Sequence, residues 1–532
     1  MLRLSGLRLR ERCDITGLRC VAAEVLGVCE DSVSVLSIYK LSIDARRKPD
    51  VRFVYTLIVK TDDESAILEK NLSNVSLYAQ PEQYVFPAVG GAASERMPVV
   101  VGTGPAGLFA ALSLAEAGLK CIVLERGPPV EQRIEDVSLF WRSGKLDESS
   151  NVQFGEGGAG TFSDGKLTTG IGDKRLRYVL ERLVGFGAPD DILYLSKPHI
   201  GTDKLCSVIK AARARLIELG CDIRFGHMLA DIGVSGGVLN SVTIDCADGL
   251  YSLATDTLIL APGNSARDTF EMLSHRGVIL SPKDFSVGLR IEHLQRDINE
   301  AQYGLTAVSA GAGLPATDYK LVVHLAGGRS VYTFCVCPGG QVVAAASEQG
   351  GVVTNGMSRY ARDGENCNGA LLVNVTPEDF GFDPLDGLEF QRMLERAAFE
   401  GGGGNGFAPV QLVGDFLKKR ASTGCDGVSP TYSPGVRYCN LWDFLPEFMC
   451  EAISEALTVF SRRVSGFAHP EAVLTAVETR SSSPVRIVRE NYEAVGIRGI
   501  FPCGEGAGYA GGIMSSAIDG IRCAERIADA IR

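Results

Sequence analysis

Hydrophobic residues recur in short runs along the first 95 residues of this 532-residue chain. The runs predict strands over residues 3–10, 32–43 and 51–60, and residues 15–28 have the spacing of a helix. We therefore expect a small α+β domain over residues 1–95.

A strand–turn–helix pattern follows a linker at residues 90–97. Residues 99–107 read VVVGTGPAG, an apolar run that leads directly into a Gly-x-Gly-x-x-Gly turn. In such a turn Gly102 permits the tight bend, Gly104 lets the backbone approach a pyrophosphate, and Gly107 lets the next helix pack against the strand. The pattern predicts a dinucleotide site.

The segment after the turn supports this prediction. Pro105 and Ala106 open a helix expected over residues 105–117, whose N-terminus favours phosphate groups. The next apolar run ends at Glu125 and Arg126. A carboxylate at this distance from the turn is placed to bind a ribose diol.

The same glycine pattern occurs again at residues 155–160 and 506–511. Neither copy has the strand, helix and acid that surround the first one, so we expect both to serve the same ligand in other ways. Six glycines between residues 154 and 170 exclude a regular element and predict a functional loop.

Amphipathic and apolar runs define the elements between this loop and residue 261. We expect helices over residues 174–184 and 202–219, the second with Thr202 as its N-cap, and strands over residues 223–225, 242–246, 250–254 and 257–261.

The next 200 residues carry no dinucleotide signal and read as an insertion with its own sheet. Strands are expected over residues 285–291, 320–325 and 331–336, and helices over residues 388–399 and 447–460. A last helix is expected over residues 514–527.

Two short segments distinguish FAD from NAD. Residues 255–263 resemble the second motif of two-dinucleotide flavoproteins, a strand ending in the small-residue turn Ala261, Pro262 and Gly263. Residues 499–505 resemble the third motif, in which an acid after Gly504 binds the ribityl chain of FAD. Glu505 stands where many relatives have Asp.

Three longer segments resemble one bacterial family. Residues 154–167, 355–364 and 504–514 are similar to the proteins described as uncharacterised FAD-dependent dehydrogenases, which have the glutathione reductase superfamily fold of two-dinucleotide-binding-domain flavoproteins. The resemblance covers nearly the whole chain and implies bound FAD, but no particular substrate.

The resemblance also implies further cofactor contacts. It places residues 157–161 along the pyrophosphate or flavin and residues 511–513 beside the pyrimidine end of the isoalloxazine, while Met228 and Leu229 are candidates for adenine. The additional candidates are Gly157, Gly158, Ala159, Gly160, Thr161, Gly511, Gly512 and Ile513.

The expected fold class is therefore α/β: a Rossmann-like FAD-binding domain interrupted by an α+β substrate domain and preceded by the small α+β domain. The FAD-binding domain is expected in two parts, residues 96–266 and 485–532, and the inserted substrate domain over residues 267–484.

Composition restricts the possible partners and location. The 45% hydrophobic residues suffice for two or three domains, and no apolar run reaches the length of about 18 residues that spans a bilayer. A net charge of −11 opposes broad binding to nucleic acid or membrane. Fifteen cysteines without fixed spacing, and no secretion signal, predict reduced thiols in the cytoplasm.

Catalytic residues and metal ligands are not identified by any pattern. Cys335 and Cys337 form a C-x-C whose strand spacing would turn both thiols to one side, either toward a flavin or into a core. Lys166 either pairs with the cofactor or is an ordinary solvated lysine. His199 and His324 are candidate proton carriers by residue type alone.

A cluster of three arginines suits an anionic group, either carboxylate or phosphate. It consists of Arg480, Arg486 and Arg489. We therefore expect a small-molecule substrate that is anionic if this cluster binds it.

The sequence predicts an FAD-dependent oxidoreductase that transfers a hydride between a small substrate and flavin. NAD(P)H as the reductant stays open because no second nucleotide fold is evident. The alternatives are an NAD-dependent dehydrogenase and a flavin-bearing module that binds RNA or protein through the N-terminal domain.

Overall fold

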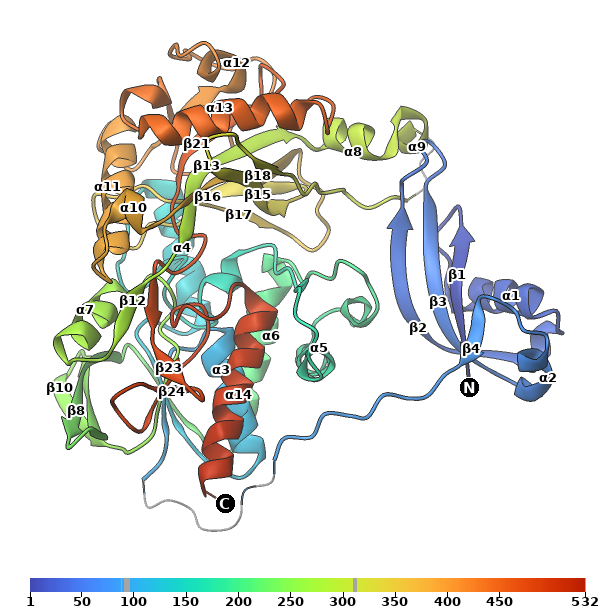
Figure 1. Ribbon diagram of the computed structural model, residues 1–532, viewed down its shortest axis with the longest axis horizontal. Coiled ribbons are helices and arrows are strands. Elements are labelled where there is room, and N and C mark those ends of the chain that lie inside the picture. Colours follow the sequence, from blue (N-terminus) through green and yellow to red (C-terminus); the bar gives the residue numbers. More distant parts are fainter. Residues whose placement is uncertain (88, 90–95, 310–312, 532) are drawn as a thin grey trace.

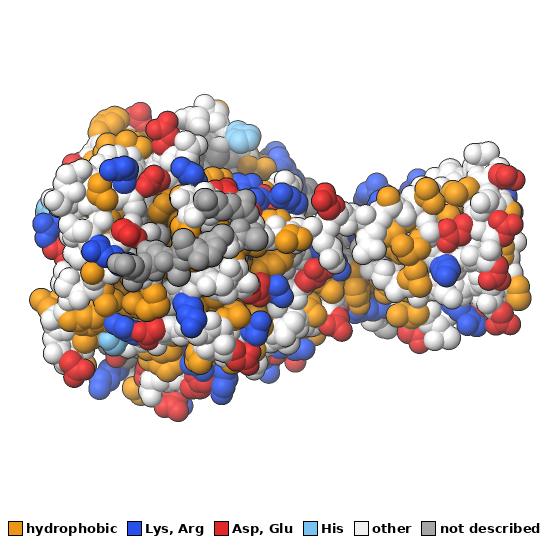
Figure 2. Space-filling view, turned by 90° about the horizontal axis from the view of Figure 1, so that it is seen from below, with side chains coloured by type: hydrophobic (Ala, Val, Ile, Leu, Met, Phe, Trp, Pro, Cys, Tyr) orange, Lys and Arg blue, Asp and Glu red, His pale blue; other side chains and the backbone are white. Residues whose placement is uncertain are grey.

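The computed structural model describes residues 1–87, 89, 96–309 and 313–531. Most of the predicted linker at residues 90–97 lies outside these residues. The described part forms a mixed α/β fold. Seen from below, it has a large lobe and a small lobe joined by a narrower waist (Figure 2).

The small lobe is a four-stranded antiparallel sheet at the N-terminal end of the chain (Figure 1). Its strands, in spatial order, are β2 (Val33–Asp44), β3 (Arg52–Thr61), β1 (Leu2–Leu9) and β4 (Val75–Leu77). Its other elements are α1 (Ile15–Leu26), η1 (Glu30–Ser32) and α2 (Glu64–Glu69). The three expected strands and the helix are confirmed; α2 and β4 were not predicted.

A five-stranded parallel sheet forms the centre of the large lobe. Its spatial order is β25 (Ile500–Pro502), β11 (Leu258–Leu260), β5 (Val99–Val101), β6 (Ile122–Glu125) and β7 (Asp222–Phe225). Except for β7, the strands have almost wholly buried apolar side chains, as expected for a parallel sheet covered on both faces. Because β25 pairs with β11, the last part of the chain returns to the first nucleotide motif.

Helices from distant parts of the sequence share a core with this sheet. They are α3 (Pro105–Glu116), α6 (Thr202–Glu218) and α14 (Ile513–Ile531). Helix α5 (Arg175–Gly185) packs against these three helices, and α4 (Val130–Ser143) contributes Val137 and Phe140 to the largest hydrophobic core. The 3-10 turns of this part are η2 (Ala159–Phe162) and η3 (Asp190–Leu193). Helices α3 and α14 lie side by side (Figure 1). Their contact is close because a Cβ at Gly520 would collide with the carbonyl of Ala106.

A three-stranded antiparallel sheet lies beside the parallel one. It consists of β8 (Met228–Ser235), β9 (Val238–Cys246) and β10 (Gly249–Ala254). The hairpin of β9 and β10 was predicted, but β8 was not.

Two details of the helices differ from the sequence-based expectations. Helix α4 was not predicted from the sequence. Thr202 is the first helical residue of α6 rather than its N-cap, which is Gly201. The Thr202 hydroxyl instead donates to the carbonyl of Thr161, 2.9 Å away, and so links α6 to the glycine-rich loop.

A seven-stranded sheet forms the other half of the large lobe. Its spatial order is β14 (Val322–His324), β15 (Ser330–Cys337), β18 (Asn366–Val375), β13 (Phe285–Leu294), β21 (Val473–Glu478), β19 (Ala408–Leu412) and β20 (Val436–Tyr438). The expected strand at 320–325 is shortened to the three residues of β14.

Helices and small ribbons surround this sheet. The helices are α7 (Arg267–His275), α8 (Gln295–Tyr303), α9 (Leu305–Ser309), α10 (Pro377–Phe380), α11 (Asp386–Gly401), α12 (Val413–Phe416), η4 (Leu441–Asp443) and α13 (Glu447–Ser461). The ribbons pair β12 (Leu280–Pro282) with β22 (Val485–Ile487), β16 (Gly340–Ala344) with β17 (Thr354–Ser358), and β23 (Arg489–Glu490) with β24 (Glu493–Ala494).

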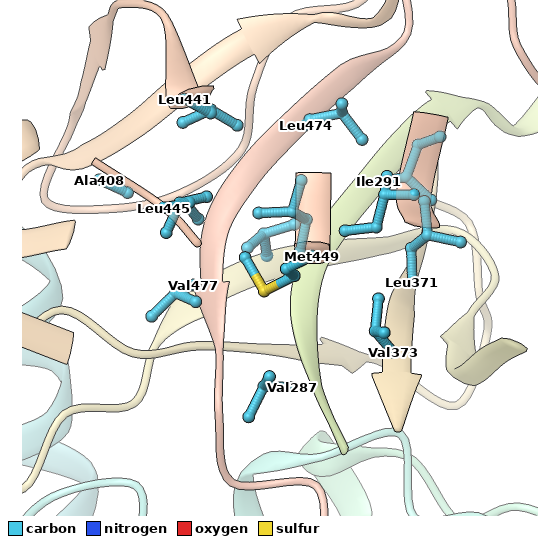
Figure 3. Close-up of a cluster of buried hydrophobic side chains, with 14 of the residues drawn as sticks. Val287, Ile291, Leu371, Val373, Ala408, Leu441, Leu445, Met449, Leu474 and Val477 are labelled. Atoms are coloured by element: carbon cyan, nitrogen blue, oxygen red, sulfur yellow. The ribbon is translucent and has the colours of Figure 1, made fainter. Parts of the chain in front are cut away.

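The largest hydrophobic core lies between α13 and the seven-stranded sheet (Figure 3). Met449 of α13 is fully buried among side chains such as Ile291, Leu371 and Leu474. Each such side chain contributes about 1.5–3 kcal/mol when it leaves water. This core fixes the sheet against which the glycine-rich loop rests.

No helix in the described parts of the chain carries an apolar stretch long enough to cross a bilayer.

Candidate functional site

The first glycine turn is packed so closely that side chains are excluded. Gly102 has φ 93°, and a Cβ on it would collide with the carbonyl of Ala261 at the end of β11. A Cβ at Gly107 would collide with the carbonyl of Gly102. Both glycines are therefore required by the close approach of β5, β11 and α3.

The N-terminus of α3 faces the glycine-rich loop. Gly104 is the N-cap of α3 and Pro105 its first residue, and no described side chain caps the free N–H groups there. A Cβ at Gly158, which has φ 64°, would lie 3.0 Å from the Cα of Gly104. Two glycine turns thus meet at a helix terminus that attracts anions.

Arg133 holds the glycine-rich loop in place, and the sequence analysis missed it. This α4 side chain is fully buried and donates to five backbone carbonyls at 2.6–3.1 Å. The acceptors are Asn151, Val152, Gly155, Glu156 and Gly158. Burial lowers the pKa of Arg133 to about 10.

Glu125 ties the same segments together from the end of β6. One carboxylate oxygen accepts from the N–H and hydroxyl of Thr103, at 3.0 and 2.6 Å, and the other from the N–H groups of Gly127 and Gly155, at 3.0 and 3.2 Å. A carboxylate has about four acceptor positions, so all are in use. A ribose diol would have to replace the Thr103 hydroxyl.

Arg126 points away from this carboxylate. Its guanidinium lies over the ring of Phe154, 4.2 Å from the centroid, and donates to Asp268 at 2.9 Å. It therefore joins β6 to the loop and to α7.

The third motif lies directly against the first and second. A Cβ at Gly504 would be 2.7 Å from the Cβ of Ala106, and one at Gly506 would be 2.5 Å from the carbonyl oxygen of Gly263. Residues near 105, 262 and 505 thus meet at the carboxyl ends of β5, β11 and β25, and we call this meeting place the crevice.

Glu505 occupies the centre of this convergence. Its carboxyl accepts from the Asn264 side chain at 2.7 Å and from the N–H of Gly512 at 3.3 Å. Burial raises the pKa of Glu505 to about 7. The group joins the segment after Pro262 to the start of α14.

The N-termini of α3 and α14 meet at Gly160. A Cβ on Gly160 would lie 3.3 Å from a side-chain carbon of Ile513 and 4.0 Å from one of Pro105. Gly511 and Gly512 are exposed, and a Cβ on either meets no described atom within 4 Å. The crevice is thus open where the two helices begin.

The remaining loop and strand candidates belong to η2 and to the start of β8. Ala159 and Thr161 are in η2, and the Thr161 hydroxyl donates to the carbonyl of Glu156 at 3.3 Å. Met228 begins β8 directly after His227, whose N–H donates to the carbonyl of Glu125 at 3.0 Å. Leu229 is buried in the core between the two sheets.

Lys166 turns toward the seven-stranded sheet. Its ammonium lies 3.2 Å from the carboxylate of Asp164, donates to the carbonyl of Val336 and lies 3.9 Å from the sulfur of Cys337. It is therefore not a freely solvated lysine, and its pairing with the cofactor stays a prediction.

The expected anion site of three arginines is wrong. Arg480 donates to Glu395 with two nitrogens, at 3.0 and 2.9 Å, and Arg489 is paired with Asp519 at 2.7 Å. Arg486 lies over the ring of Tyr509, 5.2 Å from the centroid. The three arginines are close in the sequence, but each contacts a different partner, so they do not form one anion site.

The two candidate histidines are apart. His199 pairs with Lys166 in an isolated β-bridge, its ring bonds to the carbonyl of Tyr360 at 3.0 Å, and burial lowers its pKa. His324 is exposed on the edge strand β14. Within the described residues no group of three or more His, Cys, Asp or Glu has the arrangement of a metal site.

The crevice fits a dinucleotide. Its walls are glycine backbones, and added Cβ atoms would fill the space between them. The N-termini of α3 and α14 supply N–H donors, and at Gly104 of α3 no described side chain caps them. The half-buried carboxyl of Glu505 supplies a hydrogen-bonding group where the third motif contacts the second. These features are those of an FAD-binding site.

Comparisons with known proteins agree with this class. Family models match residues 98–158, described as an FAD binding domain, and residues 284–481, described as the C-terminal domain-like part of an FAD-dependent protein. A domain of unknown function matches residues 1–60. FAD is the cofactor of this flavoprotein.

A relative from Clostridium beijerinckii, named "Uncharacterized protein", is 44% identical over 529 residues, which are 99% of this chain and 98% of the relative. The chain belongs to the same family of bacterial FAD-dependent proteins.

Solved structures are similar only at a coarse level. CabE, an aromatic hydroxylase, is 13% identical with a TM-score of 0.35, and the match covers 82% of this chain and 63% of CabE. A geranylgeranyl bacteriochlorophyll reductase-like protein from Thermoplasma acidophilum is 11% identical with a TM-score of 0.36, covering 82% and 78%. These values are too low to support an argument about activity.

Proposed function

We propose that this protein is an FAD-dependent oxidoreductase that transfers a hydride between a small substrate and its flavin. The observation that carries the proposal is the convergence of Gly104, Gly158, Gly263 and Gly504 on one crevice. The flavin supplies the hydride chemistry when it is bound.

The residues of this chain would position the cofactor. The helix termini at Gly104 and Gly512 would face the pyrophosphate and the pyrimidine edge of the ring, where their dipoles favour negative charge. Glu505 would bind the ribityl chain, and Glu125 the adenosine ribose once the Thr103 hydroxyl is displaced.

We also propose the domain division that the sequence suggested. Residues 96–266 and 485–532 would form the FAD-binding domain, and residues 267–484 the part that closes over the substrate. The seven-stranded sheet and its helices lie within the latter range and contact the glycine-rich loop through Lys166.

The first test is the absorption spectrum of the purified protein. Flavin bands near roughly 370 and 450 nm are expected, and heat denaturation should release FAD. A colourless protein that binds NAD instead would show the alternative dehydrogenase. Anaerobic mixing with a panel of small-molecule donors, NAD(P)H included, should then bleach the flavin; bound flavin that no donor reduces would favour the alternative binding module.

The sharper test substitutes Gly104. Its φ is not positive, and a Cβ would lie 3.9 Å from the nearest described atom, the Cα of Gly158, so Gly104→Ala should fold. The added methyl group would occupy the space through which a pyrophosphate reaches the helix. We expect FAD affinity to fall at least about 10-fold, which corresponds to about 1.4 kcal/mol.

Gly170→Ala is the matched control, because Gly170 is exposed and a Cβ there meets no described atom within 4 Å. Titration of the FAD-free proteins by fluorescence measures both affinities. Equal affinities of the two variants would contradict the placement of the pyrophosphate at Gly104.

A further inference from the structure

Strand β15 is irregular at its two cysteines. It pairs with β18 through Phe334 opposite Ala370 and Cys337 opposite Asn368, so two residues of β15 face the single residue between them. Cys335 has φ 40°, in the left-handed region that residues other than glycine rarely adopt. The expectation that both thiols face the same side assumed the regular alternation of a strand. The bulge interrupts that alternation between Phe334 and Cys337, so the assumption is wrong.

The bulge folds the second thiol back on the first residue. The Cys337 thiol donates to the carbonyl of Cys335 at 3.3 Å. Cys337 is fully buried and Cys335 half-buried. Strained backbone of this kind is typical of functional sites.

Two cations border the cysteines. Arg290 of β13 donates to the carbonyl of Cys335 at 2.6 Å and lies 3.5 Å from the sulfur of Cys337. Lys166 of the glycine-rich loop donates to the carbonyl of Val336 and lies 3.9 Å from the same sulfur. We call Cys335, Cys337, Lys166 and Arg290 the thiol cluster.

The nearest carboxylates do not neutralise the surrounding cations. Glu478 of β21 pairs with Arg290 at 2.7 Å, while Asp164 pairs with Lys166 at 3.2 Å and with Arg362 at 2.5 Å. Three cations thus face two carboxylates, and burial raises the pKa of Glu478 to about 7, so that the negative charge of Glu478 is only partly present near neutral pH. A positive excess stabilises a thiolate.

Two other titratable groups near the cluster are Glu292 and Tyr319. Glu292 of β13 accepts from Thr431 and Asn366, and burial raises its pKa. Burial also raises the pKa of Tyr319. The neighbouring Cys337 thiol, together with the charges of Lys166 and Arg290, lowers the pKa of Cys335 well below its usual value.

The cluster lies beside the FAD crevice. Lys166 and Asp164 belong to the loop that carries Gly158, and the charge of Cys335 helps to raise the pKa of Glu505. A redox change at the sulfurs would therefore take place near the proposed flavin.

We propose that Cys335 and Cys337 form a second redox site, a dithiol that is oxidised to a disulfide and exchanges two electrons with the FAD. In the oxidation, the Cys335 thiolate forms a bond to the sulfur of Cys337, the S–H bond of Cys337 breaks, and its proton is released. The two electrons go to oxidised FAD. This inference rests on the proposed oxidoreductase function.

Reductive titration of the holoenzyme tests the proposal. Air-oxidised protein, titrated anaerobically with dithionite, should take up about four electron equivalents per FAD, two for flavin and two for the disulfide. Cys335→Ser and Cys337→Ala should each take up about two. Cys246→Ser, at a half-buried cysteine of β9, should keep the wild-type value.

Peptide mapping of the wild type gives a readout that needs neither variant nor flavin. When the protein is denatured to expose the buried Cys337, both Cys335 and Cys337 should resist alkylation before reduction and accept it afterwards. In reduced protein at about pH 6, Cys335 should react with iodoacetamide at least about 10-fold faster than the exposed Cys29.

The outcomes separate this inference from the proposed function. Uptake of about two equivalents by wild type, with both thiols free after oxidation, would overturn the dithiol site while leaving the flavin in place. If the protein were purified without FAD and still formed the Cys335–Cys337 disulfide, the oxidoreductase function and the electron exchange with flavin would be contradicted. The dithiol itself would then stand. Slow alkylation of Cys335 at about pH 6 would overturn its role as the thiolate.

Discussion

The parallel and the seven-stranded sheets present functional groups in different ways. Around the parallel sheet, the crevice is lined by backbone: glycine turns at Gly104 and Gly158, and the N-termini of α3 and α14. Beside the seven-stranded sheet, the thiol cluster is lined by charged side chains such as Lys166 and Arg290. A backbone site leaves a contiguous sequence motif, whereas a side-chain site is assembled from strands far apart in the chain.

Substitution of Arg133 is the strongest test of this contrast, because the backbone-lined crevice depends on this one side chain. Arg133→Met would remove one donor from each of five backbone carbonyls, two of which, those of Asn151 and Val152, are buried beside the lost guanidinium. We expect a loss of about 3–5 kcal/mol in the free energy of unfolding, and loss of bound FAD. Denaturant titration and flavin content measure the two effects.

Arg142→Met is the control on the same helix, since Arg142 is exposed, and it should change stability by less than about 0.5 kcal/mol. If Arg133→Met were equally mild and kept its flavin, the glycine loop would hold its shape through backbone contacts alone.

The same contrast explains which parts of the molecule were predictable. The elements β5, α3 and β6 were predicted because glycines, apolar runs and an acid follow one another within 27 residues. Helix α4 was missed because Arg133 occupies a buried position in its stripe of Val130, Val137 and Phe140. Helical spacing after Pro129 was the signal that could have revealed it.

The thiol cluster was only partly visible in the sequence. The pair Cys335 and Cys337 was noted, but the bulge that positions it depends on the pairing of β15 with β18. Arg290 and Glu478 are 188 residues apart, and no local pattern brings them together. The arginine group at 480–489 failed for the same reason, since its acceptors come from α11 and α14.

Glu505 gives a second test of the contrast, because it is a half-buried carboxyl within the backbone crevice. Its pKa is raised by burial to about 7, above an unfolded value of about 4.3. Between these values the folded state binds more protons, so the free energy of unfolding of FAD-free protein falls as pH rises, by up to about 4 kcal/mol from this group.

Glu505→Gln should remove this part of the pH dependence. Denaturant titrations at about pH 5 and 7.5 should show a smaller fall in stability for the variant than for wild type. Glu156 and Glu478, whose pKa values are also raised by burial to about 7, leave a residual slope in both proteins. The control Glu455→Gln, at an exposed position, should show the same fall in the free energy of unfolding as wild type. If Glu505→Gln also showed the wild-type fall, the Glu505 carboxyl would not contribute to the pH dependence.

The smallest effect is expected where charges join the two regions at the surface. Asp268 of α7 is 47% exposed and lies 2.9 Å from Arg126 at the end of β6. Because water and salt screen such a pair, Asp268→Asn should change the free energy of unfolding by less than about 1 kcal/mol. Arg126→Met should cost more than Asp268→Asn, since it also removes the guanidinium from the ring of Phe154. Denaturant titration at low and high salt measures both. If Asp268→Asn lowered the free energy of unfolding by more than about 2 kcal/mol, this exposed ion pair would be as important as a buried pair such as Arg290 and Glu478. Burial would then not explain which ion pairs stabilise this molecule.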